Sequence, residues 1–232
     1  MPPLTRLAVV DHVTSPTALV FPVREIVTAC RARGVRVLVD GAHAPGMVEL
    51  DVPALGADWY VGNCHKWLCA PKGCAFLWAA KKAQRGLHPA VVSNRYGEGF
   101  LAEFDWCGTK DPSPWLSIGA ALDFHAALGG KFLRRRNHDL AVAMGARLAR
   151  AWGAETAPPE LCGSMVALRL PLRGAQTLAR AERFHAALWK RRIEVPVFLS
   201  GGRLFVRVSA QAYNEPAHYH RLERALPGLL DG

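Results

Sequence analysis

A strand–helix–strand pattern near the start of the chain constrains the fold more than any other sequence feature. Residues 7–13 form a short valine-rich apolar run, which predicts a buried strand. Pro22 then opens a predicted helix with apolar residues at helical spacing, and Gly34 ends it. A second apolar run, 35–39, follows and ends at Asp40. Two strands joined through a helix by short links are typical of a parallel β-sheet.

The rest of the chain predicts more of this α/β part and then a smaller α+β part. Apolar runs at 58–61 and 74–78 predict strands on either side of a polar loop, and the Gly- and Pro-rich residues 86–114 predict loops. After them we expect, in order, helix, helix, strand, helix, strand and strand at residues 115–128, 131–152, 165–170, 176–192, 193–197 and 204–209. A terminal helix would then place four apolar residues on one face, namely Tyr219, Leu222, Leu226 and Leu229.

These elements suggest three parts of the chain. Residues 1–128 are expected to form a partial large domain, and residues 129–157 a connecting helix. Pro158 and Pro159 mark a boundary, after which residues 158–232 are expected to form a small C-terminal domain.

Composition and charge narrow the class of protein. Half of the 232 residues are hydrophobic and 21% are charged, which excludes a disordered, collagen-like or disulfide-stapled small protein. We find neither a signal peptide nor an apolar run long enough to cross a membrane, so a cytoplasmic protein is expected. The formal net charge of +10 favours anionic partners, but the Arg-rich clusters 134–136 and 190–192 are typical of solvated helix faces. A basic nucleic-acid-binding protein is therefore a hypothesis that charge alone supports, and neither nucleic acid nor membrane is expected as a partner.

The six cysteines are expected to be reduced thiols, because the chain shows no secretory signal. Cys64, Cys69 and Cys74 recur at five-residue intervals, with His65 beside the first. This spacing makes a metal site conceivable, but structural zinc normally gathers its ligands as two close pairs, and here there is no second pair. No metal is expected.

Ionisable side chains gather where predicted strands end. Asp40 closes the second strand and His43 follows it, while His65 and Lys66 lie in the loop after the next strand. In an open α/β sheet, ligands bind beyond the carboxyl ends of the strands, so these four residues are expected to converge. Taken singly, Asp40 fits a turn or helix cap and Lys66 a surface lysine. Together they suggest a site.

A lysine and an aspartate at one such edge suit pyridoxal phosphate. Lys66 lies between a histidine and a tryptophan, where partial desolvation would lower its pKa and favour attack on a carbonyl. Pyridoxal phosphate sites pair a Schiff-base lysine with an acid that faces the pyridine nitrogen, and Asp40 is the candidate for that acid.

The segments around these residues resemble a known family. VDGAHAPG and GNCHKWLCAPKG are similar to the class V aminotransferase-like group of pyridoxal-phosphate enzymes, which has fold type I, and most of all to its isopenicillin N epimerase-like branch. The resemblance continues through DHVTSPTALVFPVREI, WCGTKDPSPWLSI and LFVRVSAQAYNE. It implies an α/β protein with a partial large domain around a mostly parallel sheet, a small C-terminal α+β domain, and a homodimer. It also implies that the chain lacks the family's N-terminal part, so weak cofactor retention and low or absent activity are expected.

The resemblance assigns three residues to the chemistry of the cofactor ring. Lys66 would form the Schiff base and, once substrate releases it, carry the α-proton. Asp40 would keep the pyridine nitrogen protonated. His43 would hydrogen-bond the phenolic oxygen, although a helix-capping role in a loop also fits it.

Further residues are assigned to the phosphate and the substrate in the same way. Asn63 and His65 would contact the phosphate, and Thr109 would reach the phosphate of the neighbouring subunit. Ser15 would lie near the cofactor, at a position where the family often has an asparagine. Arg207 would bind the substrate α-carboxylate with its planar guanidinium. For Asn63 and Thr109 an ordinary turn position is an equal alternative, and for Arg207 the alternative is a surface position on a strand.

The resemblance leaves the reaction open. Epimerisation, transamination and β-elimination share their first steps at the α-carbon, and an epimerase-like activity on an amino acid is the leading hypothesis. A cysteine desulfurase is disfavoured because it needs a nucleophilic thiol shortly before the carboxylate-binding arginine, and there is no cysteine between Ile193 and Arg207. A C–S lyase, an aminotransferase and an inactive truncated homologue remain the alternatives.

Overall fold

A computed structural model describes residues 2 and 4–230, with the side chains of residues 229 and 230 left out. The chain divides into two compact units. The first comprises Met1–His12 and Pro22–Ala127, and the second comprises Val13–Phe21 and Leu128–Gly232. The region expected to connect two domains, 129–157, therefore falls within the second unit.

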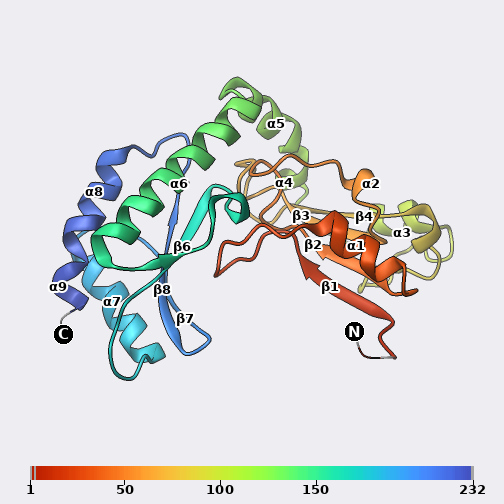
Figure 1. Cartoon of the computed structure of the whole chain (residues 1–232). Coiled ribbons are helices and arrows are strands. Elements are labelled where there is room, and N and C mark those ends of the chain that lie inside the picture. The colour runs from red at the N-terminus through yellow and green to blue at the C-terminus, as the bar shows by residue number, and fades with distance from the viewer. Residues whose placement is uncertain (1, 3, 231–232) are drawn as a thin grey trace. The chain divides into compact units, whose positions relative to one another are not determined.

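The first unit is an α/β structure built on a four-stranded sheet with the order β1-β2-β3-β4 (Figure 1). Its strands are β1 (Leu7–Asp11), β2 (Arg36–Asp40), β3 (Trp59–Asn63) and β4 (Ala75–Ala79). The first three are parallel, and β4 runs antiparallel to β3. Its helices are α1 (Val23–Arg31), α2 (Val52–Leu55), α3 (Phe100–Asp105), α4 (Ser113–Leu116) and α5 (Ile118–Ala127), with a 3₁₀ turn at Lys81–Ala83. The predicted strand–helix–strand unit with parallel strands is confirmed.

Helix α1 forms where its apolar spacing predicts. Val23, Val27 and Cys30 share one face and are buried. Pro22 precedes the first helical residue. Proline is tolerated there because an N–H group at the start of a helix would have no partner within the helix. The helix ends at Arg31, and Gly34 adopts a positive φ of 70° in the turn to β2.

A strand does form at Leu7–Asp11, but the prediction that it is buried is wrong. Leu7 and Val9 of β1 are 49% and 64% exposed. Successive side chains of a strand point to opposite faces of the sheet, and the opposite face carries Val37, Val39 and Tyr60, which are fully buried. Among the described residues, the face that carries Leu7 and Val9 is therefore the less covered one.

The second unit contains an antiparallel sheet with the order β5-β6-β8-β7 (Figure 1). Its strands are β5 (Glu155–Thr156), β6 (Met165–Arg169), β7 (Val197–Ser200) and β8 (Arg203–Ser209). Its helices are α6 (Lys131–Trp152), α7 (Leu178–Lys190), α8 (Pro216–Ala225) and α9 (Pro227–Leu230), with a 3₁₀ turn at Pro159–Leu161. The strand predicted at 193–197 is misplaced. Gly201 and Gly202 form the turn into β8, so the four residues directly before that turn pair with β8.

Helices cover one face of the second sheet. Val206 and Val208 of β8 and Leu168 of β6 lie on this face and are buried. Helix α6 packs against β6, α7 packs against β7, and α8 packs against α6 (Figure 1). These helices contribute a set of buried apolar residues that completes the core: Leu148, Phe184, Leu188, Tyr219, Leu222 and Leu226. The predicted apolar face of the terminal helix is confirmed for three of its four residues, and the side chain of Leu229 lies outside the described residues.

Within the part of the chain that the structure describes, no helix is both long enough and apolar enough to cross a membrane.

Candidate active site

The first candidate residues lie at the carboxyl edge of the sheet in the first unit. Strands β2 and β3 are parallel and end at Asp40 and Asn63, so both end at the same edge. Asp40 is half-buried and pairs in register with Val61 of β3. One of its carboxylate oxygens, Oδ1, accepts a hydrogen bond from the amide of Ala42 at 2.9 Å. This bond fixes the carboxylate over the first turn after β2.

The loops that follow β2 and β3 contact each other directly. Trp67 Nε1 donates a hydrogen bond to Nδ1 of His43 at 3.2 Å, and His43 is only 9% exposed. A Cβ atom on Gly46 would lie 2.7 Å from the backbone carbonyl of Trp67, so glycine is needed where the two backbones approach. His125 of α5 contacts the carbonyl of Gly46 through Nε2 at 3.3 Å. The loop that carries His43 is therefore packed against the loop that carries Lys66.

Lys66 lies at the start of a tight loop between β3 and β4. It is half-buried, and its carbonyl accepts a hydrogen bond from the amide of Cys69. The neighbouring His65 donates from Nδ1 to the carbonyl of Cys74 at 2.8 Å, which ties the start of the loop to its end. Asn63 is half-buried at the last position of β3. The structure thus brings Asp40, Asn63 and Lys66 to one edge, together with both predicted histidines.

A buried histidine–tyrosine pair supports this edge and was missed in the sequence. His12 Nδ1 and the hydroxyl of Tyr60 are 3.0 Å apart, and both side chains are buried. Burial lowers the pKa of His12 and so favours its neutral ring. The tautomer of that ring decides which of the two groups is the donor. Burial, and then the charge of Asp40, raise the pKa of Tyr60. The amide of His12 also donates to the carbonyl of Asp40 at 2.7 Å.

A sequence signal for His12 existed. His12 directly follows β1 and Asp40 is the last residue of β2, so both residues lie at the carboxyl end of a parallel strand. Tyr60 carried no such signal, because an aromatic residue inside a strand is ordinary.

Ser15 and Arg207 lie in the second unit. Arg207 points away from the face that carries Val206 and Val208, as the alternation of the strand predicts, and its Nη1 donates to the carbonyl of Ser15. Its Nε atom is buried and has no hydrogen-bond partner among the described residues. Burial lowers the pKa of the guanidinium. A buried donor without a partner is costly, so an anion at this position would satisfy it.

Thr109 is exposed in the loop between α3 and α4. No hydrogen bond among the described residues joins its side chain to the other candidates.

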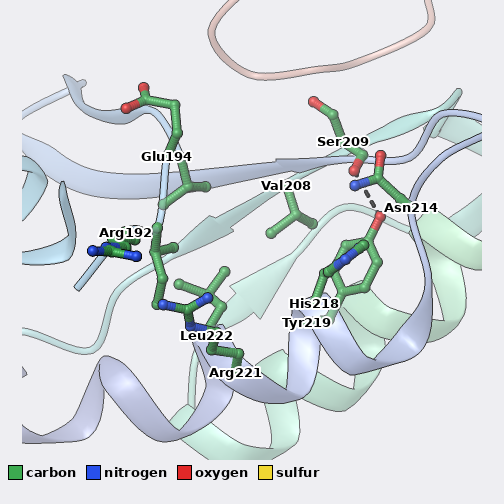
Figure 2. Close-up of a pocket in the computed structure, with 11 residues that line it drawn as sticks. Arg192, Glu194, Val208, Ser209, Asn214, His218, Tyr219, Arg221 and Leu222 are labelled. Carbon is green, nitrogen blue, oxygen red and sulfur yellow. Dashed lines mark hydrogen bonds between the residues drawn. The ribbon is translucent and has the colours of Figure 1, made fainter.

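The second unit also contains a cavity of about 190 Å³ that the predicted residues do not line (Figure 2). Arg192, His218 and Arg221 contribute polar groups to its wall. Figure 2 shows Tyr219 at this wall, where its hydroxyl donates to the carbonyl of Ser209 at 2.6 Å, and burial raises the pKa of the tyrosine to about 12. Val208 lines the cavity, so Arg207 faces the other side of the sheet.

Comparisons with known proteins find relatives in sequence and in fold. A probable L-cysteine desulfhydrase from Arabidopsis thaliana, described as chloroplastic, is 40% identical over 97% of this chain and 51% of its own length. An isopenicillin N epimerase from Amycolatopsis lactamdurans is 39% identical over 99% of this chain and 61% of its own length. The cystine C–S lyase C-DES, solved with its product cysteine persulfide, shares the fold with a TM-score of 0.81 at 22% identity, covering all of this chain and 62% of that one.

The chain thus spans about half to three fifths of the length of the relatives it matches. Its fold is fold type I of the pyridoxal-phosphate enzymes. The family model Aminotransferase class-V matches residues 1–179, and members of that family are pyridoxal-phosphate enzymes. The chain therefore belongs to the class V aminotransferase family.

Proposed function

We propose that the first unit binds pyridoxal phosphate through Lys66 and that the protein acts at the α-carbon of an amino acid. The observation that carries the proposal is the hydrogen bond from Trp67 to His43. This bond, with the close approach at Gly46, links the loop after Asp40 to the loop that carries Lys66. The acid that such a cofactor requires therefore lies at the end of β2, and the amine lies on the adjoining loop at the same sheet edge.

The side chains at this edge fit the groups of the cofactor ring. Asp40 accepts one backbone hydrogen bond at Oδ1, and a carboxylate has further lone pairs with which to face a protonated pyridine nitrogen. His43 accepts at Nδ1, so its neutral ring carries the proton at Nε2, where it can donate to the phenolic oxygen. When bound, the cofactor supplies a ring that withdraws electrons from the substrate α-carbon. Lys66 Nζ is the group that attaches the cofactor and moves the α-proton.

The phosphate would be held by neutral and cationic donors. Asn63 offers its amide from the end of β3. His65 already donates from Nδ1 to Cys74, so it can also donate to a phosphate only when both ring nitrogens carry protons. We assign Thr109 to the phosphate of a second subunit and Ser15 to the cofactor surroundings, in a cytoplasmic homodimer.

Arg207 is the proposed carboxylate-binding residue. Its buried Nε needs an acceptor, and a carboxylate can bind a guanidinium through two parallel hydrogen bonds. Arg207→Lys should raise the KM for an amino acid substrate more than it lowers kcat, because a lysine retains the charge but loses the planar fork.

The attachment site can be tested without activity. The full chain is titrated with pyridoxal phosphate, reduced with borohydride and digested for peptide mass analysis. We expect the reduced adduct on Lys66 and its loss in Lys66→Ala. Lys72→Ala is the matched control, because Lys72 is an exposed lysine of the same loop and should not affect labelling of Lys66. An adduct that persists elsewhere at the same yield in Lys66→Ala would refute the assignment.

The reaction itself is proposed as epimerisation, with removal of sulfur from cysteine as the second candidate. The relatives named for these two activities are 39% and 40% identical to this chain, so identity does not separate them. Both reactions begin with loss of the α-proton. Exchange of this proton in heavy water with inversion, and with the side chain intact, would indicate epimerisation, whereas sulfide released from L-cysteine would indicate the second reaction. Labelling of Lys66 with neither product would identify a cofactor-binding homologue without this activity.

A further inference from the structure

Cys64 and Cys74 lie at the two ends of the loop that carries Lys66. Strands β3 and β4 are antiparallel, and their last pair in register is Asn63 with Ala75. Cys64 and Cys74 are the residues directly beyond this last pair, and the amide of Cys64 donates to the carbonyl of Cys74 at 3.2 Å. Residues that lie opposite each other in antiparallel strands have Cα atoms about 4.5–5.5 Å apart. This spacing is within the range of roughly 4.4–6.8 Å that a disulfide requires.

The side chains of Cys64 and Cys74 are also buried in the same apolar cluster. Cys64 and Cys74 are 3% and 0% exposed, and both belong to a small apolar cluster with Leu68, Ala70 and Ala121. The proximity of Cys74 is one cause of the raised pKa of Cys64, and the Cys74 thiol donates to the carbonyl of Pro71 at 3.3 Å. Among the described residues, no third histidine, cysteine or acid joins them in a group that could hold a metal ion.

We propose that Cys64 and Cys74 form a redox pair, in which a peroxide oxidises the two thiols to an intramolecular disulfide. In the first step one thiolate attacks the peroxide, becomes a sulfenic acid and releases the other peroxide oxygen as water or alcohol. In the second step the other thiol attacks the sulfenic sulfur, which forms the S–S bond and expels water. Two electrons pass from the two sulfurs to the peroxide, and a dithiol reverses the reaction by thiol–disulfide exchange.

Burial determines the rate of this reaction. The pKa of Cys64 is raised, by burial first and by Cys74 second, so little thiolate is present in the closed loop. Cys69 is the exposed cysteine of the same loop. Peroxide should therefore oxidise Cys69 first, and the Cys64–Cys74 disulfide should form more slowly, as the loop opens.

The disulfide would close the loop covalently at its base. Residues 65–73, which include Lys66, would then be held between two bonded residues, with His65 and Cys74 already joined by a hydrogen bond. This consequence for the cofactor rests on the proposed function, whereas the disulfide does not. Lys66→Ala retains both thiols, so it should form the same disulfide even if no cofactor binds.

The sequence allows a clean test. Trypsin cleaves after Lys66 and Lys72, which places Cys64, Cys69 and Cys74 on three different peptides. The reduced full-length chain is exposed to hydrogen peroxide for increasing times, alkylated under denaturing conditions and digested without reductant. We expect a linked species that joins the peptide ending at Lys66 to the peptide beginning at Gly73, with two hydrogens fewer than the separate peptides. It should disappear when dithiothreitol is added.

Matched variants separate this pair from the other thiols. Cys69→Ser should leave the linked species unchanged, and Cys74→Ser should abolish it. Cys30→Ser removes another buried cysteine, on α1, and should also leave the species unchanged. The circular dichroism spectrum of Cys74→Ser checks that it is folded. A disulfide from Cys69 to either partner, or Cys64 and Cys74 both fully alkylated after prolonged oxidation, would overturn the proposal.

Discussion

The two units of the chain bury their sheets to different degrees. In the second unit, helices α6, α7 and α8 build a continuous core over the antiparallel sheet, with Leu204 and Val206 fully buried. In the first unit, one face of the parallel sheet is buried at Val37 and Val39, while the other face leaves Val9 64% exposed. Among the described residues, the second unit is thus built mainly for packing, and the first unit holds most of the candidate chemistry on a sheet that is covered less evenly.

The largest expected effect lies in the core of the second unit. Leu204→Ala removes a fully buried side chain and should lower the free energy of unfolding by about 2–5 kcal/mol, measured by urea titration. Leu199→Ala on the neighbouring strand is the control, because Leu199 is 38% exposed and should cost much less. Equal losses in the two variants would contradict the picture of a well-packed core.

A substitution under the candidate site should have the next largest effect. A Cβ atom at residue 41 would overlap the ring of Tyr60, so Gly41→Ala should cost about 1–3 kcal/mol and weaken cofactor binding through Asp40. The loss is measured by urea titration and by titration with pyridoxal phosphate.

The control for this substitution is Gly119→Ala. Gly119 lies in α5, and among the described residues no atom outside its own helix backbone lies within 4 Å of an added Cβ, so this variant should be stabilised by roughly 0.5–1 kcal/mol. Unchanged stability in Gly41→Ala would show that Tyr60 can move away.

His12 should make the first unit sensitive to acid. Its folded pKa is lowered by burial, so below the ordinary pKa of about 6.5 the unfolded chain binds more protons than the folded one. Stability should therefore fall as the pH drops from about 6.5 towards the folded pKa, and level off below it. His12→Asn can still accept a bond from Tyr60 but does not titrate, so its melting temperature should change less with pH. An equal slope in both proteins would exclude His12 as the cause.

The smallest effect is expected on the exposed face of β1. Val9→Ala should change the free energy of unfolding by less than about 0.5 kcal/mol. Val39→Ala on the buried face of the same sheet should cost at least about 1.5 kcal/mol, measured in the same urea titration. A large loss for Val9→Ala would show that β1 is covered, for example by another chain.

The site shows where reasoning from the sequence succeeded and where it could not. Asp40 and Lys66 were placed at one edge because parallel strands end on the same side of a sheet. The support from His12 and Tyr60 was missed, since it depends on a contact between residues 48 positions apart. Similarly, no local pattern indicates that Arg207 bonds the backbone of Ser15.

Local chemistry by itself determined the strand–helix–strand unit around α1 with its parallel pairing, the long helices of the second unit, and the motifs that identify the family. These depend on side-chain spacing and on the residues that start or stop an element. Only the tertiary structure decided that Val9 is exposed, that β7 begins at Val197, and that two thiols meet at the base of the Lys66 loop. The burial of a side chain, the register of a strand and the contact of two thiols all depend on which other segment of the chain packs beside them. A local stretch of sequence does not contain that information.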